Sequence, residues 1–327
     1  MFSIALPLAL AATWFGLAAY IHLLTRRGTL EVAGPRSMHV APLPTGAGIV
    51  LVPIILAGWY ISPDVGDQAR LSVLLAAGCL ALVSWLDDMV RLPAVPRLLA
   101  HTVAVGVCLF QLSPEWRAMP WLPLAVERLL EAVAWIWFIN LFNFMDGIDG
   151  LAGSEAVAVT LGYIAIAGLT GWQGGSIWLA ALIVTVMMGY LRWNLPPARV
   201  LMGDAGAIPL GFLLGWLILE LAFAGYWASG LILPMYFCAD ATLTLLRRVR
   251  HGAWPSEPHR EHFYQRAAQA SGSHAPALIL VAIGNGCLVV AALLSLRSPM
   301  LGIVVAAVIT AALLLRLASM PRRVPPL

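Results

Sequence analysis

Asn-Leu-Phe-Asn-Phe-Met-Asp-Gly-Ile-Asp-Gly-Leu-Ala-Gly, residues 140–153, ends an apolar run that is long enough to cross a membrane. The segment nevertheless carries two carboxylates and two carboxamides within ten residues. A charged side chain at membrane depth costs about 2.5–3.5 kcal/mol on insertion scales, so an ionisable group there is a functional hypothesis by default. Asp146 and Asp149 are close enough on one helical turn to share a cation. The glycines between them let the backbone turn or approach a ligand. We therefore expect a membrane helix that ends in a polar, ligand-binding turn.

The composition surrounding this segment is that of a membrane protein. Of 327 residues, 61% are hydrophobic and only 11% are charged, whereas a soluble domain carries roughly a quarter charged residues. Each spanning helix needs about 20 mostly apolar residues. The sequence therefore predicts an all-α polytopic membrane protein that forms one integral membrane domain over residues 1–327. We expect eleven spans, at about 3–24, 46–61, 69–86, 96–113, 127–143, 153–170, 175–192, 205–224, 228–246, 275–296 and 299–319.

The arginines predict the orientation, because the chain has no lysine. With the N-terminus on the periplasmic side, 15 of the 19 arginines fall on inner loops or inner span ends. This excess is the positive-inside pattern of cytoplasmic loops, so we expect a cytoplasmic C-terminus. The net charge of +3 then reports topology and gives no reason to expect nucleic-acid binding.

With this topology, the unusual polar residues collect on the cytoplasmic face. They lie in five inner loops, at about 25–45, 87–96, 144–152, 193–204 and 247–274, which we expect to form the active site. The candidate site residues are Arg36, His39, Asp87, Asp88, Asn140, Asn143, Asp146, Asp149, Asn194, Asp204, His259, Arg260 and His262. The outer loops carry only scattered charges, and we expect Glu220, near the outer end of its span, to be solvated.

The residue types in these loops indicate a reaction class. Five clustered aspartates repel one another unless a cation lies between them. Oxygen ligands without cysteine suit Mg²⁺, or Mn²⁺ in its place, better than zinc. Arginine and histidine suit phosphate oxygens. Phosphoryl transfer asks the protein mainly for positioning and charge neutralisation. A site of this kind at a lipid boundary suggests the joining of a soluble phosphate donor to a lipid phosphate.

Each signal also has a structural reading. Asp87-Asp88 can be the polar end of a helix paired with Arg91, and Asp204 can cap the helix that follows it. Histidines in a polar loop are often inert, and we expect Asp240 to be a buried ion-pair partner or a residue behind the site. A rival function is a secondary transporter or ion-coupled carrier. Transporters place their acids near the bilayer midplane and often have repeated halves, whereas here the acids lie at one face and no repeat is evident.

In order along the chain, these motifs resemble the polyprenyl-phosphate N-acetylhexosamine-1-phosphate transferase superfamily. The resemblance runs from Arg36 to Arg266 and includes the Asp-Asp pair, the 140–152 motif and an asparagine ten residues before a Met-Gly-Asp. Two departures stand out. Residues 42–48 read Pro-Leu-Pro-Thr-Gly-Ala-Gly where relatives have Pro-Thr-Pro-Arg-Gly-Gly-Gly. Residues 259–262 read His-Arg-Glu-His, not the triple histidine of the muramoyl-pentapeptide branch, which favours O-antigen or related surface polysaccharide synthesis.

The resemblance implies a function and a role for each residue. It implies transfer of a sugar phosphate from a UDP-N-acetylhexosamine to undecaprenyl phosphate in the bacterial inner membrane, with Mg²⁺ required and UMP released. By resemblance Asp87, Asp88, Asn194 and His262 are catalytic and Asp204 binds the metal with Asp88. The residues implied to bind substrate are Arg36, His39, Asn140, Asn143, Asp146, Asp149, His259 and Arg260. Direct displacement and a two-step route through a covalent Asp88 intermediate stay open. The identity of the sugar also stays open, as does the oligomeric state, for which a homodimer is one option.

Overall fold

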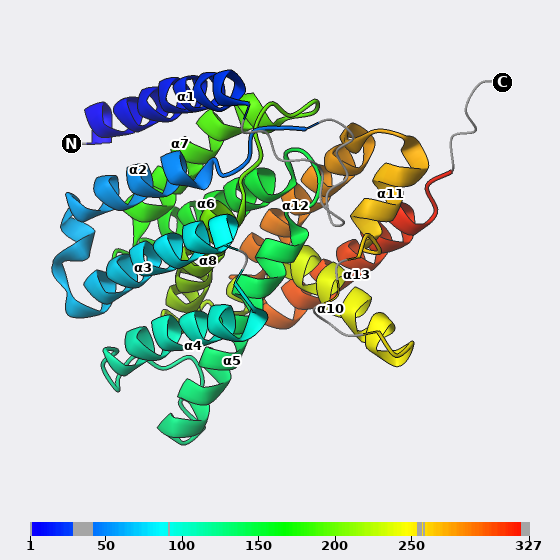
Figure 1. Cartoon of the computed structure of the whole chain (residues 1–327). Coiled ribbons are helices and arrows are strands. Elements are labelled where there is room, and N and C mark those ends of the chain that lie inside the picture. Colours follow the sequence, from blue (N-terminus) through cyan, green and yellow to red (C-terminus); the bar gives the residue numbers. More distant parts are fainter. Residues whose placement is uncertain (1, 29–41, 91, 254–256, 258, 322–327) are drawn as a thin grey trace.

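The computed structural model describes residues 2–28, 42–90, 92–253, 257 and 259–321. Within these residues the regular structure is helical (Figure 1). The helices are α1 (Phe2–Arg27), α2 (Gly48–Tyr60), α3 (Gln68–Val90), α4 (Ala94–Phe110), α5 (Leu124–Met145), α6 (Leu151–Thr170), α7 (Ile177–Asn194), α8 (Asp204–Phe223), α9 (Trp227–Ile232), α10 (Met235–Arg250), α11 (Phe263–Ser271), α12 (His274–Ser295) and α13 (Pro299–Ala318), with a short 3₁₀ helix, η1 (Pro63–Gly66). The predicted all-α membrane fold is confirmed. Its orientation stays a prediction.

The expected spans correspond to helices, with one interruption. The span expected at 228–246 is split into α9 and α10, because Pro234 has no backbone N–H to continue the hydrogen-bond ladder. Seven helices of the described chain are long and apolar enough to cross a membrane, namely α1, α3, α6, α7, α8, α12 and α13. α2 and α4 are apolar but shorter, and α5 carries three charged side chains in its first two turns. The number of spans therefore stays a prediction.

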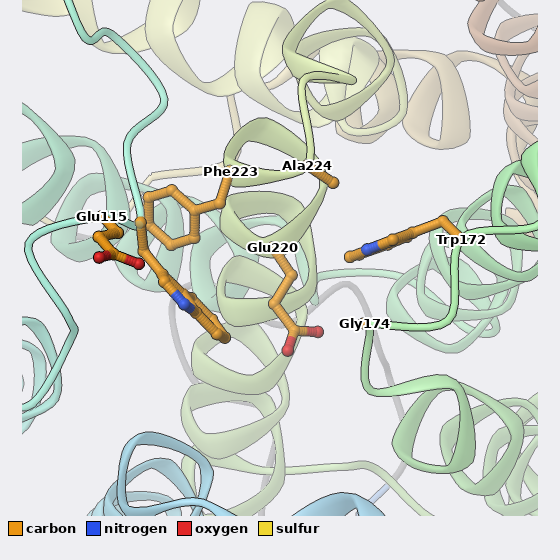
Figure 2. Close-up of a pocket in the computed structure, with 7 residues that line it drawn as sticks. Glu115, Trp172, Gly174, Glu220, Phe223 and Ala224 are labelled. Atoms are coloured by element: carbon orange, nitrogen blue, oxygen red, sulfur yellow. The ribbon is translucent and has the colours of Figure 1, made fainter.

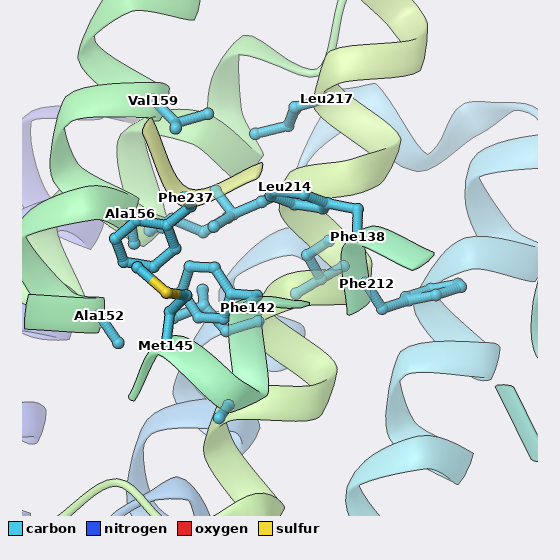
Figure 3. Packing of buried hydrophobic residues seen from close by; sticks show 14 of the residues in the cluster. Phe138, Phe142, Met145, Ala152, Ala156, Val159, Phe212, Leu214, Leu217 and Phe237 are labelled. Atoms are coloured by element: carbon cyan, nitrogen blue, oxygen red, sulfur yellow. The ribbon is translucent and has the colours of Figure 1, made fainter. Parts of the chain in front are cut away.

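α8 forms the centre of the bundle. It packs against α2, α3, α5, α6 and α9, and nearly all of its side chains are buried, as expected for a helix that is apolar all round. Aromatic rings fill the space around it, with Trp135 of α5 stacked on Phe212 of α8 at 4.7 Å. Phe142 and Phe237 continue this cluster towards α10 (Figure 3). This core fixes α5 and α8 side by side.

Glu220, at the far end of α8, is buried, so the expectation of a solvated side chain is wrong. Its carboxylate is 1% exposed and accepts hydrogen bonds from Arg70 Nε (3.2 Å), Tyr163 Oη (2.7 Å) and Ser176 N (3.0 Å). A cavity of about 190 Å³ lies beside it (Figure 2). Glu115, Trp116, Trp172, Gly174, Glu220, Phe223 and Ala224 line this cavity. A buried carboxylate is stable only when it is hydrogen-bonded in this way, and the network joins α3, α6, α7 and α8.

The up-and-down order of the helices positions the candidate site. The C-terminal ends of α3, α5 and α7 meet the beginnings of α4, α6 and α8, because Arg97 contacts Asp87, Asp88 contacts Ala205 N and Asn194 contacts Gly150 N. Residues 92–93, 146–150 and 195–203 therefore meet at one end of the bundle, and Glu220 lies at the opposite end of α8. Polar residues that are far apart in sequence are brought together because each follows or precedes a membrane helix.

Candidate active site

An arginine joins two of the predicted aspartates. Asp87, near the end of α3, is 6% exposed. Its Oδ1 accepts from Leu92 N (2.6 Å) and its Oδ2 from Arg97 Nη1 (3.0 Å). The same Arg97 Nη1 lies 3.5 Å from Oδ2 of Asp204, the first residue of α8. Arg91, the partner expected for the Asp-Asp pair, lies outside the described residues. One guanidinium from α4 thus neutralises carboxylates from α3 and α8.

Asp88 contacts the beginning of α8. Its Oδ2 accepts from Ala205 N at 3.2 Å, so a carboxylate of α3 meets a free N–H of the first turn, where the helix dipole favours negative charge. The residue before the helix is Gly203, whose φ of +73° places it in the left-handed region. Asp204 is the first helical residue and does not act as the cap. Its side chain instead lies 3.5 Å from Arg97 Nη1.

The chain that precedes α2 lies against this same end of α8. Leu201 N donates to Pro44 O (2.9 Å), and Ala47 N and Gly48 N donate to Leu201 O and Met202 O (3.0 and 3.1 Å). A Cβ atom on Gly48 would lie 2.2 Å from Gly206 N, so glycine is needed for the approach. Arg36 and His39, which were expected to bind substrate, lie outside the described residues.

Asp149 and Asn194 join the 146–150 turn to the loop between α7 and α8. Asp149 Oδ2 accepts from Ala198 N (2.9 Å), and its Oδ1 lies 3.1 Å from His274 Nδ1. Asn194 accepts from Gly150 N and donates to Val200 O, both at 2.8 Å. Both residues are at most 4% exposed. They hold the two connections together, and their predicted contacts with a substrate stay predictions.

The pKa of Asp146 depends on the neighbouring carboxylates. Asp146 is half-buried at the C-terminal end of α5. Burial, together with the charges of Asp204 and Asp149, raises the pKa of its carboxyl to about 7. The unprotonated carboxylate is therefore costly unless a cation approaches.

The two asparagines of α5 make different contacts. Asn140 Nδ2 donates to Ile136 O (2.7 Å) and lies 3.4 Å from His101 Nδ1 of α4. The carbonyl of Asn143 accepts from Asp146 N at 3.3 Å, which ends the helix. Asn140 thus lies between α4 and α5, whereas Asn143 is at the mouth of the turn. Their roles in substrate binding stay predictions.

The 259–262 motif leads into α11, a helix that the sequence did not predict. His262 is 2% exposed and its Nδ1 lies 3.2 Å from Asp240 Oδ1 of α10. The ring of His259 lies 4.9 Å from the ring of His262. Arg260 is exposed. Burial raises the pKa of the neighbouring Glu261, but the hydrogen bond and charge of Arg248, with Arg247, outweigh this effect and leave it below its usual value.

α11 is anchored on the 144–147 turn by Tyr264. The Tyr264 hydroxyl donates to Phe144 O at 3.2 Å. A Cβ atom on Gly147 would lie 2.3 Å from the same hydroxyl oxygen, so only glycine leaves room for it. The histidine motif is thereby tied to the 140–153 segment through a contact that the sequence pattern did not reveal.

The carboxylates fit a metal ion that arrives with its substrate. In the part of the chain that the structure describes, no three His, Cys, Asp or Glu side chains are arranged to hold a metal by themselves. Mg²⁺ is commonly bound by one or two carboxylates plus substrate phosphates. Asp88 and Asp204 both lie at the beginning of α8 and offer only oxygen ligands, and Asp146, whose pKa is raised by burial and by the charge of Asp204, lies near them. This donor set suits a hard divalent cation.

Two residues of this site were not among the predicted ones. Arg97 lies between Asp87 and Asp204, and His274 lies against Asp149. Asp240 lies against His262 as the buried partner that the sequence led us to expect. The sequence could have indicated Arg97, since this arginine lies in the first turn of the next helix, only ten residues after Asp87. His274 follows the Ser273 cap of α12, and nothing in its sequence surroundings indicates an acidic partner.

Comparisons with known proteins show which family the central part of the chain resembles. Residues 70–222 match glycosyl transferase family 4. This part of the chain, slightly less than half of its length, is similar to that family. The family 4 region runs from the beginning of α3 to the end of α8 and therefore holds Asp87, Asp88, the 140–153 segment, Asn194 and Asp204. The resemblance inferred from the motifs is confirmed.

Several bacterial transferases are similar to the family 4 region and its flanks. A probable undecaprenyl-phosphate N-acetylglucosaminyl 1-phosphate transferase of Bacillus subtilis is 25% identical over 264 residues, covering 78% of this chain and 74% of the relative. A decaprenyl-phosphate N-acetylglucosaminephosphotransferase of Mycolicibacterium smegmatis is 24% identical over 319 residues (84% and 77%). A phospho-N-acetylmuramoyl-pentapeptide-transferase of Deinococcus radiodurans is 29% identical over 230 residues (61% and 70%). None of these three is named as a transporter.

Proposed function

We propose that the protein transfers an N-acetylhexosamine-1-phosphate from a UDP-sugar to undecaprenyl phosphate, giving undecaprenyl-diphospho-sugar and UMP. The observation that carries this proposal is the arrangement of Asp87, Arg97 and Asp204, with Asp88 beside them, at one end of a bundle of membrane-length helices. The names of the relatives support it, since they pair a polyprenyl phosphate with an amino sugar phosphate. The site supports phosphoryl transfer because such reactions depend on positioning and charge neutralisation.

The proposed reaction is a direct displacement. An oxygen of the lipid phosphate attacks the sugar-linked phosphorus of the donor, and a new phosphorus–oxygen bond forms. The bond from that phosphorus to the bridging oxygen breaks, and its electron pair leaves with UMP. Asp87 takes up the proton of the lipid phosphate when that phosphate is protonated. Arg97 orients Asp87 through the 3.0 Å contact and stabilises the negative charge that gathers on the transferred group.

The carboxylates at the beginning of α8 are the proposed metal ligands. Asp204, with Asp88, would hold Mg²⁺ or Mn²⁺ there. When bound, such an ion neutralises the diphosphate of the donor and makes the leaving UMP a weaker base. Asp88 is already oriented by Ala205 N, so the protein needs little rearrangement to present it.

The remaining residues are proposed to bind and orient the donor. Asp146 and Asp149, with Asn140 and Asn143, shape the nucleotide pocket, and the buried hydrogen bonds of Asn194 keep the 195–203 loop in place behind it. The 259–262 motif contacts the diphosphate or the sugar. Arg36 and His39 of the first loop complete the phosphate contacts. The His-Arg-Glu-His sequence favours a surface polysaccharide such as O-antigen over peptidoglycan.

The proposed setting is the bacterial inner membrane, with the site on the cytoplasmic face. This orientation rests on the arginine distribution, because 15 of 19 arginines fall on that side when the N-terminus is periplasmic. The soluble UDP-sugar then reaches the site from the cytoplasm, and the lipid phosphate reaches the same site from the bilayer.

The test is release of UMP by the detergent-purified protein given undecaprenyl phosphate and a panel of UDP-sugars. UDP-GlcNAc, UDP-GalNAc, UDP-FucNAc and UDP-QuiNAc are tested with Mg²⁺, with Mn²⁺ and with EDTA. We expect metal-dependent release with one donor. Asp87→Asn, Asp204→Asn and His262→Ala should each lower it by orders of magnitude, whereas Glu115→Gln, an exposed acid at the other end of the bundle, should leave it unchanged. Absence of release with every donor, together with solute flux in proteoliposomes, would instead identify a transporter.

A further inference from the structure

A fully buried carboxylate lies behind the histidine motif. Asp240, in the second turn of α10, is 0% exposed. Its two oxygens accept hydrogen bonds from Tyr236 Oη (3.0 Å), Thr244 Oγ1 (3.3 Å), Phe263 N (3.1 Å) and Tyr264 N (3.3 Å), and Oδ1 lies 3.2 Å from His262 Nδ1. A buried carboxylate needs hydrogen-bond donors of this kind. One side chain of α10 therefore meets two backbone N–H groups and one imidazole.

The two backbone contacts hold the beginning of α11. Phe263 and Tyr264 are its first residues, and their N–H groups have no acceptor within the helix. Asp240 supplies that acceptor from another helix, and His262 N donates to Gln265 Oε1 at 3.3 Å. The residue that begins α11 is thus fixed through its backbone.

The ring of His262 is fixed as well. It is stacked on Tyr264 with ring centroids 5.6 Å apart and planes 17° apart, and His259 lies on it at 4.9 Å. A carboxylate facing Nδ1 keeps the proton of a neutral imidazole on that nitrogen. Nε2 is then the ring nitrogen that is left to meet a ligand.

We propose that Asp240 is a positioning residue that fixes the tautomer and orientation of His262, so that Nε2 faces the sugar diphosphate of the donor. This inference rests on the proposed function and adds a residue to it. Asp240 does not touch the substrate and acts only through His262. A carboxylate that only capped α11 would need no contact with the imidazole, whereas the structure has both.

Two substitutions separate positioning from capping. Asn caps helices about as well as Asp, so Asp240→Asn keeps an acceptor for α11 but removes the negative charge that faces Nδ1. Asp240→Ala removes both. Thr242→Val is the matched control, since Thr242 lies on the same helix and its hydroxyl accepts from Trp137 Nε1, away from the site.

The first measurement uses the full-length protein in detergent without substrate. Histidine labelled with ¹⁵N in the ring reports the tautomer at pH 8, and His262→Gln assigns the signal. We expect Nδ1 of His262 to be protonated in the wild type and in Thr242→Val, and a mixture of tautomers in Asp240→Asn. A wild-type ring protonated on Nε2, or an unchanged ring in Asp240→Asn, would overturn the proposal.

The second measurement is UMP release with the donor that the wild type accepts. Loss of a group that orients an active-site histidine through its other nitrogen typically costs about 10–100-fold. We expect this fall in kcat for Asp240→Asn, with an apparent melting temperature close to that of the wild type. Full activity of Asp240→Asn would overturn the inference, as would an activity loss that only follows its melting temperature. If the wild type releases no UMP with any donor, the proposed function fails, while the tautomer measurement still decides the role of Asp240.

Discussion

Arg97 Nη1 lies 3.0 Å from Asp87 Oδ2, although ten residues and the break between α3 and α4 separate the two along the chain. Asp87 also accepts from Leu92 N. Its carboxylate therefore binds both the connection between α3 and α4 and the arginine in the first turn of α4. Arg97 is about 30% exposed, and Asp87 is nearly buried. Because Asp87 is buried, solvent ions screen this pair less than they screen a pair on the surface. The arginine is therefore a fixed positive charge between the acids of α3 and α8.

Removal of this charge should affect activity more than folding. Arg97→Gln leaves Asp87 and Asp204 facing each other without their shared cation. Loss of one charge-stabilising donor costs about 10²–10³-fold in kcat where it has been measured in enzymes, and we expect a fall of that order in UMP release. The matched control is Arg316→Gln in the last turn of α13, which should retain activity. Full activity of Arg97→Gln would remove the arginine from the mechanism.

A second prediction concerns the contact between Gly147 and Tyr264. Gly147→Ala places a methyl group 2.3 Å from the Tyr264 hydroxyl oxygen, so α11 must move away from the 144–147 turn. Overpacking of this kind costs about 1–3 kcal/mol. We expect a lower apparent melting temperature and weak UMP release. Gly147→Ala with Tyr264→Phe should recover part of both, because the substitution removes the clashing oxygen.

The control for this pair is Tyr264→Phe alone. It loses the 3.2 Å hydrogen bond to Phe144 O, and a hydrogen bond of this kind is worth about 1 kcal/mol. If the double variant is no better than Gly147→Ala, the glycine is needed for its backbone conformation or for the substrate, and not for the docking of α11.

Much of this architecture follows from the sequence, because membrane helices need long apolar runs and leave a strong signal. The acids of 140–153 and the Asp-Asp pair were placed at one end by counting spans. The partners of those acids could not be predicted. Asn194 bonds to Gly150 and Val200 only because α6 and α7 lie side by side. Glu220 was expected in water, yet Arg70, from 150 residues away, stabilises it inside the protein. Such pairings depend on helix packing, which a single sequence does not specify.

The pH dependence of stability should show whether Asp146 titrates near neutral pH in the folded protein. Its pKa is raised to about 7 in the folded protein, against about 3.9 for an unfolded chain. The folded state therefore binds the proton more tightly, and stability is greatest below the unfolded pKa and declines as the pH rises towards 7. In EDTA, we expect Asp146→Asn to melt at a higher temperature than the wild type at pH 8 and at a similar temperature near pH 4.

Mg²⁺ with UDP-sugar should narrow the gap at pH 8, since a cation beside Asp146 stabilises its ionised form. Scanning fluorimetry in detergent from pH 4 to 8 gives these temperatures. If the difference between the melting temperatures of the two proteins is the same at every pH from 4 to 8, Asp146 does not ionise near neutrality. Asp67→Asn, at the opposite end of the bundle, controls for the loss of any one carboxylate.

The choice between direct displacement and a covalent Asp88 intermediate rests on an exchange experiment. In the two-step route Asp88 attacks the sugar-linked phosphorus and releases UMP before the lipid phosphate enters, so the enzyme would exchange labelled UMP into UDP-sugar without any lipid. Asp88 Oδ2 accepts from Ala205 N at 3.2 Å, a contact that ties it to the beginning of α8 and suits a fixed ligand better than a nucleophile. We expect exchange to require undecaprenyl phosphate, and Asp88→Asn to need more Mg²⁺ for half-maximal activity. Rapid lipid-independent exchange in the wild type, abolished in Asp88→Asn, would instead establish the covalent route.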